Sequence, residues 1–550
     1  MKDKSNRWRI IYQILIITLV LNSCSKPNAD YIIYNAKIYT VNEAFDTAQV
    51  MVIKEGKILD IGGLDLLNTY RAVNKINAQG RYIYPGFNDA HCHFTGYAMD
   101  KYKLALFGTD SFEEVVAAVV DYGARNTRQW IEGRGWDQND WDVKEFPTKD
   151  TLDKLFPNTP IFLMRIDGHA ALCNQKALEL AGITLNTKIE GGEILQKNNQ
   201  LTGLLIDNAV DYVKKIIPIR TRDEVVADFV NAEKDCVSLG LSSVTDCGLK
   251  NQVAKWLEYA YEKKQLKIKT SFMLADEKDN YDDFLQSPFA RTDRFHCIGY
   301  KVYSDGALGS RGAYLLEDYH DRHQHKGILL KSKDSLEALA RLLYATDYQL
   351  CTHAIGDGAN RLVLQSYASV LPADNDRRWR VEHAQVVSPE DLHYFKDYKT
   401  VPSVQPTHAT SDMYWAEKRL GQNRIQSAYA YNDLLSQLGW MPLGTDFPVE
   451  ELNPLYTFCA AVFRVDKKNF PDNGFQMNNA LSRQDALRGM TIWAAKAAFE
   501  EKEKGSLEKG KWADFVILPI DLMTASVDTI YKSGVVATYI NGECVYRNRK

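Results

Sequence analysis

Eight short apolar runs between residues 82 and 445 constrain the fold of this chain most. Amphipathic stretches such as 335–348 and 357–370, whose apolar spacing is helical, lie between some of these runs. The runs are 82–87, 241–246, 269–274, 298–303, 349–353, 379–383, 401–405 and 441–445. Strands that alternate with helices build a parallel sheet, and eight such units close into a barrel. We therefore predict an α/β fold, a (β/α)8 TIM barrel over residues 82–500.

One interval between the runs is too long for a single crossover helix. About 150 residues separate the first run from the second, so a large insertion is expected at about 97–240. Residues 111–122 and 221–239 have the spacing of helices, and residues 161–166 and 192–196 resemble short strands. The insertion should therefore contain structure of its own.

The two ends of the mature chain have β patterns. Residues 31–40 and 48–62 are rich in β-branched and aromatic side chains, as are 510–518 and 535–546, where Asn541-Gly542 is a hairpin signal. We predict that 31–81 and 501–550 pair into one small β-domain that flanks the barrel.

The first thirty residues have the pattern of a targeting segment. Lys2, Lys4, Arg7 and Arg9 precede an apolar segment at 10–20 that is short for a bilayer span, and Leu21-Asn22-Ser23-Cys24 resembles a bacterial lipoprotein lipobox. This predicts a signal peptide at 1–23, a lipid on Cys24 and a tether at 24–30. The protein would be anchored at an extracytoplasmic face of a bacterial membrane. An ordinary signal peptide and an uncleaved anchor are the alternatives.

Composition excludes two classes of protein. In 550 residues, 45% are hydrophobic and 25% charged, which is typical of a globular protein rather than a disordered one. The net charge of −4 and the absence of a basic cluster with interleaved aromatic residues argue against nucleic acid as a partner. Eight cysteines besides Cys24 lack CxxC spacing, so they could be buried thiols or form disulfides. A homodimer is also possible.

Titratable residues close several of the apolar runs. They are His91 and His93 after the first, Lys301 in the fourth, His353 and His383 ending the fifth and sixth, and Asp446 after the eighth. In a barrel, side chains at the carboxyl ends of strands converge on one site. Histidine suits zinc, a carboxylate can both bind a metal and accept a proton, and a lysine fits a cation site only if its charge is removed. This set predicts a site for two divalent metal ions. Any one of these residues could instead be a buried core residue, with Lys301 paired to Asp305 or Glu382.

The same residues resemble the amidohydrolase superfamily. Finer motifs resemble its YtcJ-like branch, also called amidohydrolase-3, over about residues 29–546. These motifs are Gly133-Arg134-Gly135-Trp136-Asp137, Asp167-Gly168-His169-Ala170, Thr202-Gly203-Leu204-Leu205, Asp305-Gly306-Ala307-Leu308-Gly309-Ser310-Arg311, His353-Ala354-Ile355-Gly356-Asp357 and Ser482-Arg483-Gln484-Asp485-Ala486-Leu487.

The resemblance implies a metal-dependent hydrolase of a carbon–nitrogen bond other than a peptide bond. The substrate would be an amide, an N-acyl or N-formyl amine or a cyclic amide, attacked by a metal-bound hydroxide. His91, His93 and Asp446 would hold one zinc ion, His353 and His383 the other, and a carboxylated Lys301 would bridge them. Asp446 would also act as the catalytic proton carrier.

The resemblance also implies a substrate pocket formed partly by the insertion. Its candidate residues are Trp136, His169, Asp207 and Arg311, each of which could instead be a buried structural residue, and Asp207 stands where the family pattern has Glu. Among the other histidines, His408 is the best candidate for a substrate-side residue. Three alternatives remain: a deaminase, an aminoacylase-like hydrolase in which Cys247 is the metal bridge, and a lipid-anchored binding protein without activity. The residue types do not identify the substrate.

Overall fold

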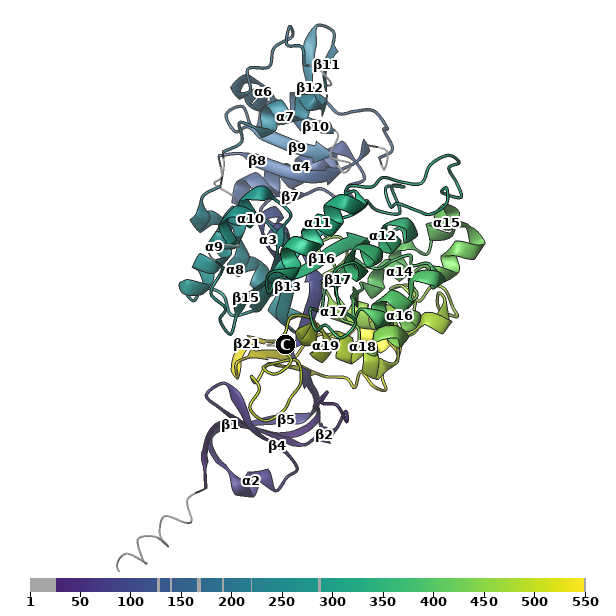
Figure 1. Ribbon diagram of the computed structural model, residues 1–550. Coiled ribbons are helices and arrows are strands. Elements are labelled where there is room, and N and C mark those ends of the chain that lie inside the picture. The colour runs from purple at the N-terminus through teal and green to yellow at the C-terminus, as the bar shows by residue number, and fades with distance from the viewer. Residues whose placement is uncertain are drawn as a thin grey trace, which may run out of the picture. The chain divides into compact units, whose positions relative to one another are not determined.

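The computed structural model describes residues 26–125, 129–138, 141–165, 170–189, 192–218, 220–284 and 288–548 (Figure 1). It divides into two compact units. One combines the residues up to Tyr97 with those from Phe229 onward, and the other is Ala98–Asp228. The second unit falls within the interval where the sequence predicts an insertion.

A sheet of seven parallel strands forms the centre of the first unit. In spatial order the strands are β18 (Val401–Ser403), β17 (Arg380–His383), β16 (Gln349–Ala354), β15 (Phe295–Tyr303), β14 (Lys269–Ala275), β13 (Leu241–Leu249) and β6 (Phe87–Cys92). Every neighbouring pair is parallel. Most of their residues are buried on both faces, as expected where helices cover a parallel sheet.

Residues 441–446 occupy the eighth position, between β18 and β6. Leu443 forms a parallel bridge with Val404, and the Gly444 N–H donates to the Val404 carbonyl at 3.0 Å. On the other side, the Ala90 N–H donates to the Leu443 carbonyl and the Asp446 N–H to that of His91, at 3.2 and 2.7 Å. The segment is too irregular to count as a strand, but its hydrogen bonds join both edges of the sheet. The result is an α/β TIM-like barrel.

The first barrel strand lies later in the chain than the prediction of 82–87. Residues 82–85 belong to β5 (Arg71–Pro85), which pairs with β19 (Phe515–Leu518) in a different sheet, and the barrel strand is β6. The chain passes between the two sheets at Gly86, whose N–H donates to the Asp514 carbonyl. A Cβ atom at Gly86 would collide with the Ser242 side chain, so this close crossing requires glycine. The sequence pattern shows one continuous apolar run here and does not reveal the change of sheet.

The helices of the barrel follow the predicted apolar spacing. In α11, Leu336, Ala340 and Leu343 are buried at intervals of four and three residues, and the Ser332 side chain caps the helix by accepting from the Ser335 N–H. From β13 onward the helices are α9 (Asn251–Glu262), α10 (Lys278–Phe284), α11 (Lys333–Tyr344), α12 (Asp357–Ala368), η3 (Pro389–Asp391), α13 (His393–Asp397), α14 (Pro406–Asp412), α15 (Ala416–Arg424), η4 (Ile425–Ser427), α16 (Tyr431–Leu438), α17 (Pro454–Phe463), η5 (Met477–Asn479), α18 (Arg483–Gly489), α19 (Ile492–Ala497) and α20 (Val527–Tyr531).

A second sheet combines strands from both ends of the chain. Besides β5 and β19 it contains β1 (Asn28–Tyr39), β2 (Thr47–Ala48), β3 (Val50–Lys54), β4 (Lys57–Gly62), β20 (Ala537–Ile540) and β21 (Glu543–Arg547), with α2 (Leu66–Thr69) between β4 and β5. β19 lies antiparallel beside β5, with Phe515 opposite Pro85. Phe515 also stacks on Tyr539, with ring centroids 4.3 Å apart. The core of this sheet therefore depends on residues more than 400 positions apart.

The Ala98–Asp228 unit has its own six-stranded mixed sheet and core. Its strands in spatial order are β11 (Gly192–Lys197), β12 (Gln200–Asp207), β10 (Ala170–Cys173), β9 (Ile161–Arg165), β8 (Ile131–Trp136) and β7 (Leu104–Ala105). Its helices are α4 (Phe112–Arg125), α5 (Asp150–Leu155), α6 (Gln175–Leu180) and α7 (Asn208–Lys214), while α3 (Phe94–Asp100) and α8 (Arg222–Ser238) span the two boundaries between the units. Val115 and Val119 of α4 pack on Trp136 and Leu163.

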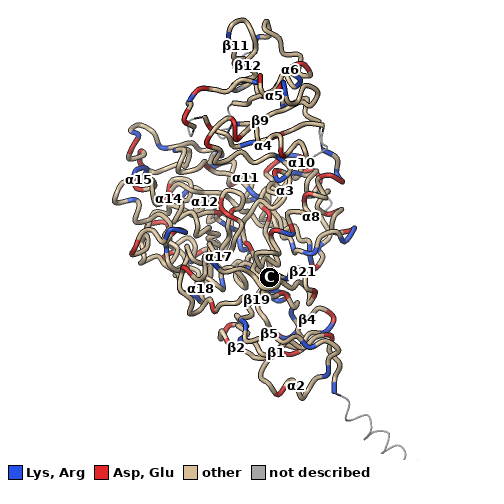
Figure 2. The backbone as a smooth tube through the Cα atoms, turned by 180° about the vertical axis from the view of Figure 1, so that it is seen from behind, with Lys and Arg blue, Asp and Glu red and all other residues tan. Residues whose placement is uncertain are grey.

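Charged residues of both signs are interspersed along the chain (Figure 2). This distribution agrees with the small net charge of −4. Cys92, Cys173, Cys247, Cys297, Cys351 and Cys459 are buried thiols that form no disulfide within the described ranges. Among the helices that the structure describes, none is both long and apolar enough to cross a bilayer. Cys24 lies outside the described residues.

Candidate metal centre

The barrel brings the six predicted metal ligands together at the carboxyl ends of its strands. They come from β6 and the residue after it (His91, His93), β15 (Lys301), β16 (His353), β17 (His383) and the eighth position (Asp446). Five of the six are buried, and the His93 side chain is 28% exposed. At least 25 residues of chain separate any two of the strands that supply these ligands, so the cluster is a product of the fold.

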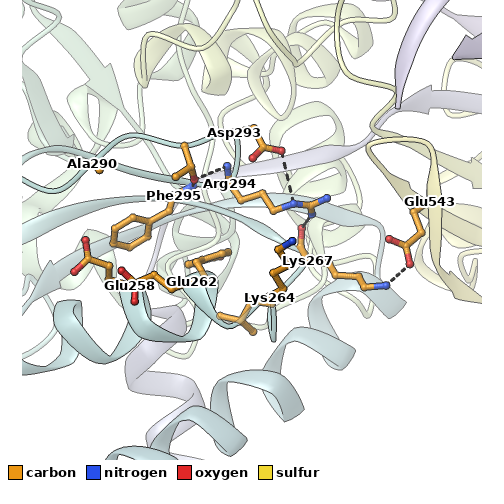
Figure 3. A pocket seen from close by; sticks show the side chains of 12 residues that line it. Glu258, Glu262, Lys264, Lys267, Ala290, Asp293, Arg294, Phe295 and Glu543 are labelled. Atoms are coloured by element: carbon orange, nitrogen blue, oxygen red, sulfur yellow. Dashed lines mark hydrogen bonds and ion pairs between the residues drawn. The ribbon is translucent and has the colours of Figure 1, made fainter. Parts of the chain in front are cut away.

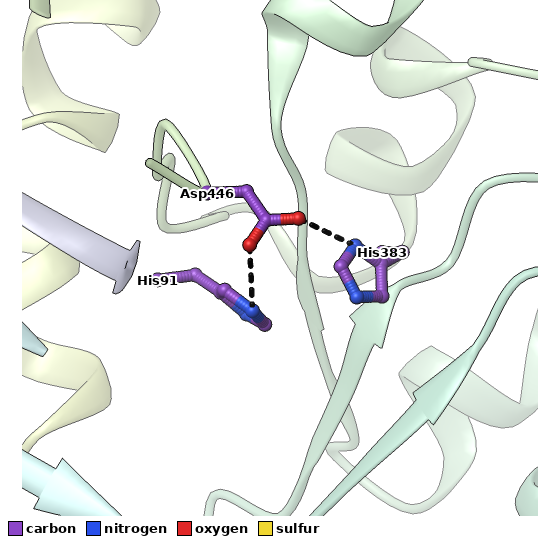
Figure 4. Close-up of side chains that lie close together, drawn as sticks. All are labelled: His91, His383 and Asp446. Carbon is purple, nitrogen blue, oxygen red and sulfur yellow. Dashed lines mark ion pairs between the residues drawn. The ribbon is translucent and has the colours of Figure 1, made fainter. Parts of the chain in front are cut away.

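Asp446 lies at the centre of the cluster. Its Oδ1 is 3.1 Å from Nε2 of His93 and 3.6 Å from Nε2 of His91, and its Oδ2 is 3.6 Å from Nε2 of His408 and 4.0 Å from Nδ1 of His383. Figure 4 shows one carboxylate oxygen facing His91 and the other facing His383. One ligand atom from each of these three residues lies within 4.8 Å of the other two, which is close enough to share one ion.

Two of the site residues have left-handed backbone conformations. The φ angle is 73° at His383 and 63° at Asp446, a region that residues other than glycine rarely adopt. In a regular strand, neighbouring side chains point to opposite faces. The turn at His383 instead lets both Glu382 and His383 approach His91. Such local strain is typical of functional sites.

Three of the histidines, His91, His353 and His383, are held in the neutral form that binds metals. Burial, and then the nearby Lys301 charge, lower the pKa of His91 to about 4 and that of His353 to about 3. Burial also lowers the pKa of His383 well below its usual value. For Asp446, burial raises the pKa, but the surrounding imidazoles outweigh it and hold the pKa well below the ordinary value. Neutral imidazoles around a carboxylate are a typical zinc ligand set.

Three of the imidazoles are oriented by hydrogen bonds through Nδ1. The partner of His91 is Oε2 of Glu382 at 2.5 Å, that of His93 is the Cys247 carbonyl at 3.0 Å, and that of His383 is Oε1 of Gln405 at 2.7 Å. The Gln405 amide nitrogen donates to the Ser403 carbonyl, so its oxygen is the atom that faces His383. Sequence reasoning missed the roles of Glu382 and Gln405. The position of Glu382, directly before a ligand histidine, was the available signal.

Unpartnered nitrogen atoms show that the cluster fits a metal ion. Nε2 of His353 and Nε2 of His408 are buried and form no hydrogen bond within the described part of the chain. A buried polar atom without a partner is costly, whereas an imidazole lone pair that faces a carboxylate can bind a divalent cation. The residues present therefore fit the metal centre that the sequence predicts.

Lys301 and Cys247 differ in their relation to the site. The Lys301 side chain is buried and lines the cavity described below, with Nζ 3.3 Å from Nε2 of His91. No described carboxylate, including those of Asp305 and Glu382, lies within 4.0 Å of this amine. The Cys247 thiol instead packs in an apolar cluster with Met273, and burial raises its pKa well above the usual value. Its geometry resembles that of a core residue.

A cavity of about 390 Å³ opens at the cluster. It combines metal-ligand candidates with apolar, aromatic and polar residues. Its lining consists of His93, Lys301, Tyr303, Ala307, Leu308, Gly309, His353, Ile355, His383, Gln385, His408, Asp412, Trp415, Asp446, Val449 and Glu450. Ligand pockets for small molecules are typically about 300–1,000 Å³, so this one suits a small substrate.

The weaker predictions for substrate residues have different outcomes. His408 lines the cavity and lies beside Asp446. Arg311 is not part of the described lining, because its guanidinium forms a two-point ion pair with Asp321. Trp136 is buried in the core of the Ala98–Asp228 unit, where Nε1 donates to the Leu163 carbonyl. His169 and the side chain of Asp207 lie outside the described residues.

A second cavity, of about 520 Å³, lies away from this chemistry (Figure 3). It is lined in part by Phe295 at the amino end of β15, opposite to the end that carries Lys301. Four of its charged groups are paired, Lys267 with Glu543 and Arg294 with Asp293. We therefore place the functional site at the carboxyl ends of the strands.

A comparison with protein families shows the family to which the chain belongs. Residues 75–546 match the profile Amidohydro_3, described as "Amidohydrolase family". The chain belongs to the amidohydrolase family. This confirms the amidohydrolase resemblance and makes the chain a member of a family of metal-dependent hydrolases.

Three relatives match along nearly the whole chain. LONG AFTER FAR-RED 3 of Arabidopsis thaliana is 32% identical over 542 residues, covering 94% of this chain and 92% of the relative. The Bacillus subtilis protein YtcJ is 30% identical over 526 residues, covering 92% and 98%. The N-substituted formamide deformylase of Arthrobacter pascens is 25% identical over 546 residues, covering 94% and 98%.

A solved structure supports the same amidohydrolase fold. An uncharacterized metal-dependent hydrolase from Pyrococcus furiosus superposes with a TM-score of 0.75 at 26% identity, covering 90% of this chain and 100% of that one. The correspondence extends over most of the chain, so the two proteins share a fold.

Proposed function

We propose that the protein hydrolyses a carbon–nitrogen bond, other than a peptide bond, in a small amide, N-acyl or N-formyl amine, or cyclic amide. The observation that carries this proposal is the Asp446 carboxylate, which lies among His91, His93, His383 and His408 beside a cavity of about 390 Å³. A relative that is an N-substituted formamide deformylase supports this choice of bond.

The ligands divide into two groups. We assign His91, His93 and Asp446 to one zinc ion and His353 and His383 to a second, with a carboxylated Lys301 between them. When bound, the metal ions would polarise the substrate carbonyl and lower the pKa of water so that it can attack at neutral pH. The burial of the Lys301 amine beside His91, without a carboxylate within ion-pair distance in the described chain, supports its conversion to a carbamate.

Asp446 is the proton carrier in this proposal. Its pKa lies well below the usual value, so the carboxylate is ionised and can accept a proton from the attacking water. Nε2 of His408 lies 3.6 Å from Oδ2 of this carboxylate, and both residues line the cavity. Asp446 would then pass the proton to the leaving nitrogen, because an amine leaves readily only after protonation.

The cavity lining indicates the shape of the substrate. Tyr303, Leu308, Ile355 and Trp415 provide apolar and aromatic surface near the metal ligands, and Gln385, Asp412 and Glu450 add polar groups to the lining. Such a lining suits a substrate with a small acyl group and an apolar or aromatic substituent on nitrogen.

The deciding experiment uses the zinc-loaded protein that starts at residue 25. It would be incubated with N-substituted formamides, acetamides, cyclic amides and amino-heterocycles, and the released amine, acid and ammonia would be measured. We expect amine and acid from the amides, and a loss of about 10²–10⁴-fold in kcat for Asp446→Asn. Ammonia from a heterocycle alone would identify a deaminase. Tight binding without turnover by the metal-loaded protein would identify a binding protein and refute the proposal.

The location of the protein is a separate part of the proposal. We infer that Cys24 carries lipid and that the hydrolase works on the outer side of a bacterial cell membrane. The support for this is the sequence pattern of residues 2–24 alone.

A further inference from the structure

Three fully buried side chains lie in contact behind the metal ligands. Arg380, Glu382 and His91 each have 0% exposure. Oε2 of Glu382 is 2.5 Å from Nδ1 of His91, and Oε1 of Glu382 is 2.7 Å from Nε of Arg380. The Glu382 carboxylate therefore touches an imidazole on one side and a guanidinium on the other.

Arg380 connects three parts of the barrel wall. Its Nη2 donates to the Ala90 carbonyl of β6 at 2.6 Å, to Oγ of Ser403 in β18 at 2.7 Å, and to Oε2 of Glu382 in β17 at 3.1 Å. Nε of Arg380 is within ion-pair distance of Oε1 of Glu382, but its N–H does not point at that oxygen. The hydrogen bond from Nη2 to Oε2 is therefore the contact that orients the carboxylate. Arg380 thus fixes Glu382 relative to the strand that carries His91.

Stability alone does not account for this pair. Burying a carboxylate and a guanidinium costs several kcal/mol per ion, and apolar side chains of similar volume often stabilise a fold at least as well. What the charged pair provides is a fixed acceptor for the Nδ1 proton of His91. With that proton on Nδ1, the lone pair lies on Nε2, which faces Asp446 and Lys301 at 3.6 and 3.3 Å.

The three oriented imidazoles have unequal partners. His93 donates to a backbone carbonyl and His383 to a side-chain amide, which are neutral, whereas His91 donates to a carboxylate. An anionic partner orients an imidazole and makes it a stronger metal ligand. The geometry points to Glu382 as a positioning residue that holds His91 as the strongest imidazole ligand of the centre, with Arg380 as the group that keeps Glu382 in place. This inference rests on the proposed metal site.

The test is zinc retention by the full mature chain. Zinc-loaded wild type, Glu382→Gln and Arg380→Lys would be titrated with a chelator of known affinity, and the cobalt(II)-loaded forms compared by visible absorption. Glu382→Gln keeps the size of the side chain and an acceptor oxygen but removes the charge. We expect it to weaken zinc retention by about 10–100-fold and to change the cobalt spectrum. Arg380→Lys should change zinc retention and the cobalt spectrum in the same direction as Glu382→Gln, but by a smaller amount.

Glu500→Gln is the matched control. Glu500 is also a buried carboxylate, paired with Lys504 at 2.7 Å and bonded to Ser271 near the amino end of β14, and within the described chain it forms no hydrogen bond or ion pair with a metal-site residue. It should lower the melting temperature without changing zinc retention or the cobalt spectrum. If Glu500→Gln weakened zinc retention as much as Glu382→Gln, the effect would be general destabilisation and the inference would be overturned.

The result separates this inference from the proposed function. Wild-type zinc retention and an unchanged cobalt spectrum in Glu382→Gln would overturn the positioning role, whatever the protein hydrolyses. Conversely, a wild type that binds zinc through Glu382 but cleaves none of the amides would overturn the proposed function alone. If Glu382→Gln does not fold, Arg380→Lys decides the question by the same two measurements.

Discussion

The amine nitrogen of Lys301 lies 3.3 Å from Nε2 of His91 in the barrel interior. Burial lowers the pKa of this amine, but Tyr303, Cys247, Glu382 and Asp446 raise it, and the net shift is upward. Without metal the lysine is thus a cation beside a ligand imidazole. Metal ions would repel that cation and favour the neutral amine, which can react with carbon dioxide.

Lys301→Ala should therefore lose much of the second metal ion. We expect wild type and Cys247→Ala to hold two ions per chain and Lys301→Ala about one, measured by elemental analysis after loading with bicarbonate present. Metal loading of the wild type should also fall when bicarbonate is removed. The opposite pattern, with two ions retained in Lys301→Ala and both lost in Cys247→Ala, would mean that the cysteine is the bridge.

Gly444→Ala should disturb the metal centre through the backbone. A Cβ atom at Gly444 would lie 2.5 Å from the backbone nitrogen of His91, so the eighth segment would have to move away from β6. Overpacking of this kind costs about 1–3 kcal/mol, and the shift would also move Asp446. Urea unfolding and zinc retention should both report the change. Gly534→Ala, which has open space around its Cβ, is the control and should leave both measurements unchanged.

The metal-free protein should lose stability through His91 as the pH falls. Burial lowers the pKa of His91 to about 4, compared with 6.5 in the unfolded chain, so unfolding at intermediate pH takes up a proton. The contribution of His91 to the free energy of unfolding is complete above pH 6.5 and is lost as the pH falls towards 4. At pH 5 the loss is about 2 kcal/mol. Urea unfolding at pH 7 and pH 5 measures this loss, with chelator-treated wild type compared with His91→Asn. Equal pH dependence in the two proteins would contradict it.

Cys24 should be the only site of lipid attachment. A labelled fatty acid supplied to a bacterial host should enter the wild type and not Cys24→Ala, and wild type should sediment with membranes. The attached chains contribute about 0.8 kcal/mol per buried methylene, which is enough to anchor the protein without a membrane-binding face on the hydrolase. Equal labelling of Cys24→Ala would show that residues 1–24 are not a lipoprotein signal.

Much of the barrel is readable from the sequence because its strands are buried on both faces. Runs such as 241–246 and 349–353 are buried throughout, and each lies within an observed strand. The exception is the run at 82–87. Tyr84 and Phe87 are both apolar and buried, but Tyr84 belongs to the sheet of the chain ends and Phe87 to the barrel. Burial alone does not distinguish two cores that meet at one glycine.

The metal-ligand candidates are readable for a different reason. Histidine, lysine and aspartate are unusual at the ends of buried strands, so His91, Lys301 and Asp446 are conspicuous in the sequence. The residues that hydrogen-bond to these ligands are not conspicuous in the sequence. Glu382 and Gln405 are ordinary polar residues until the fold places them 2.5 and 2.7 Å from ligand imidazoles. The reverse holds for Arg311, whose motif predicts a substrate contact although its guanidinium pairs with Asp321.

The sequence by itself thus determined the fold class, the family resemblance and the residues able to bind metal, because periodicity and residue type are local properties of the chain. Tertiary structure alone decided that Asp446 lies among four imidazoles, that Lys301 rather than Cys247 lines the cavity, and that a charged pair lies behind His91. Each of these facts depends on distances between strands that are far apart in the chain. Barrel closure sets those distances, and no local pattern encodes them.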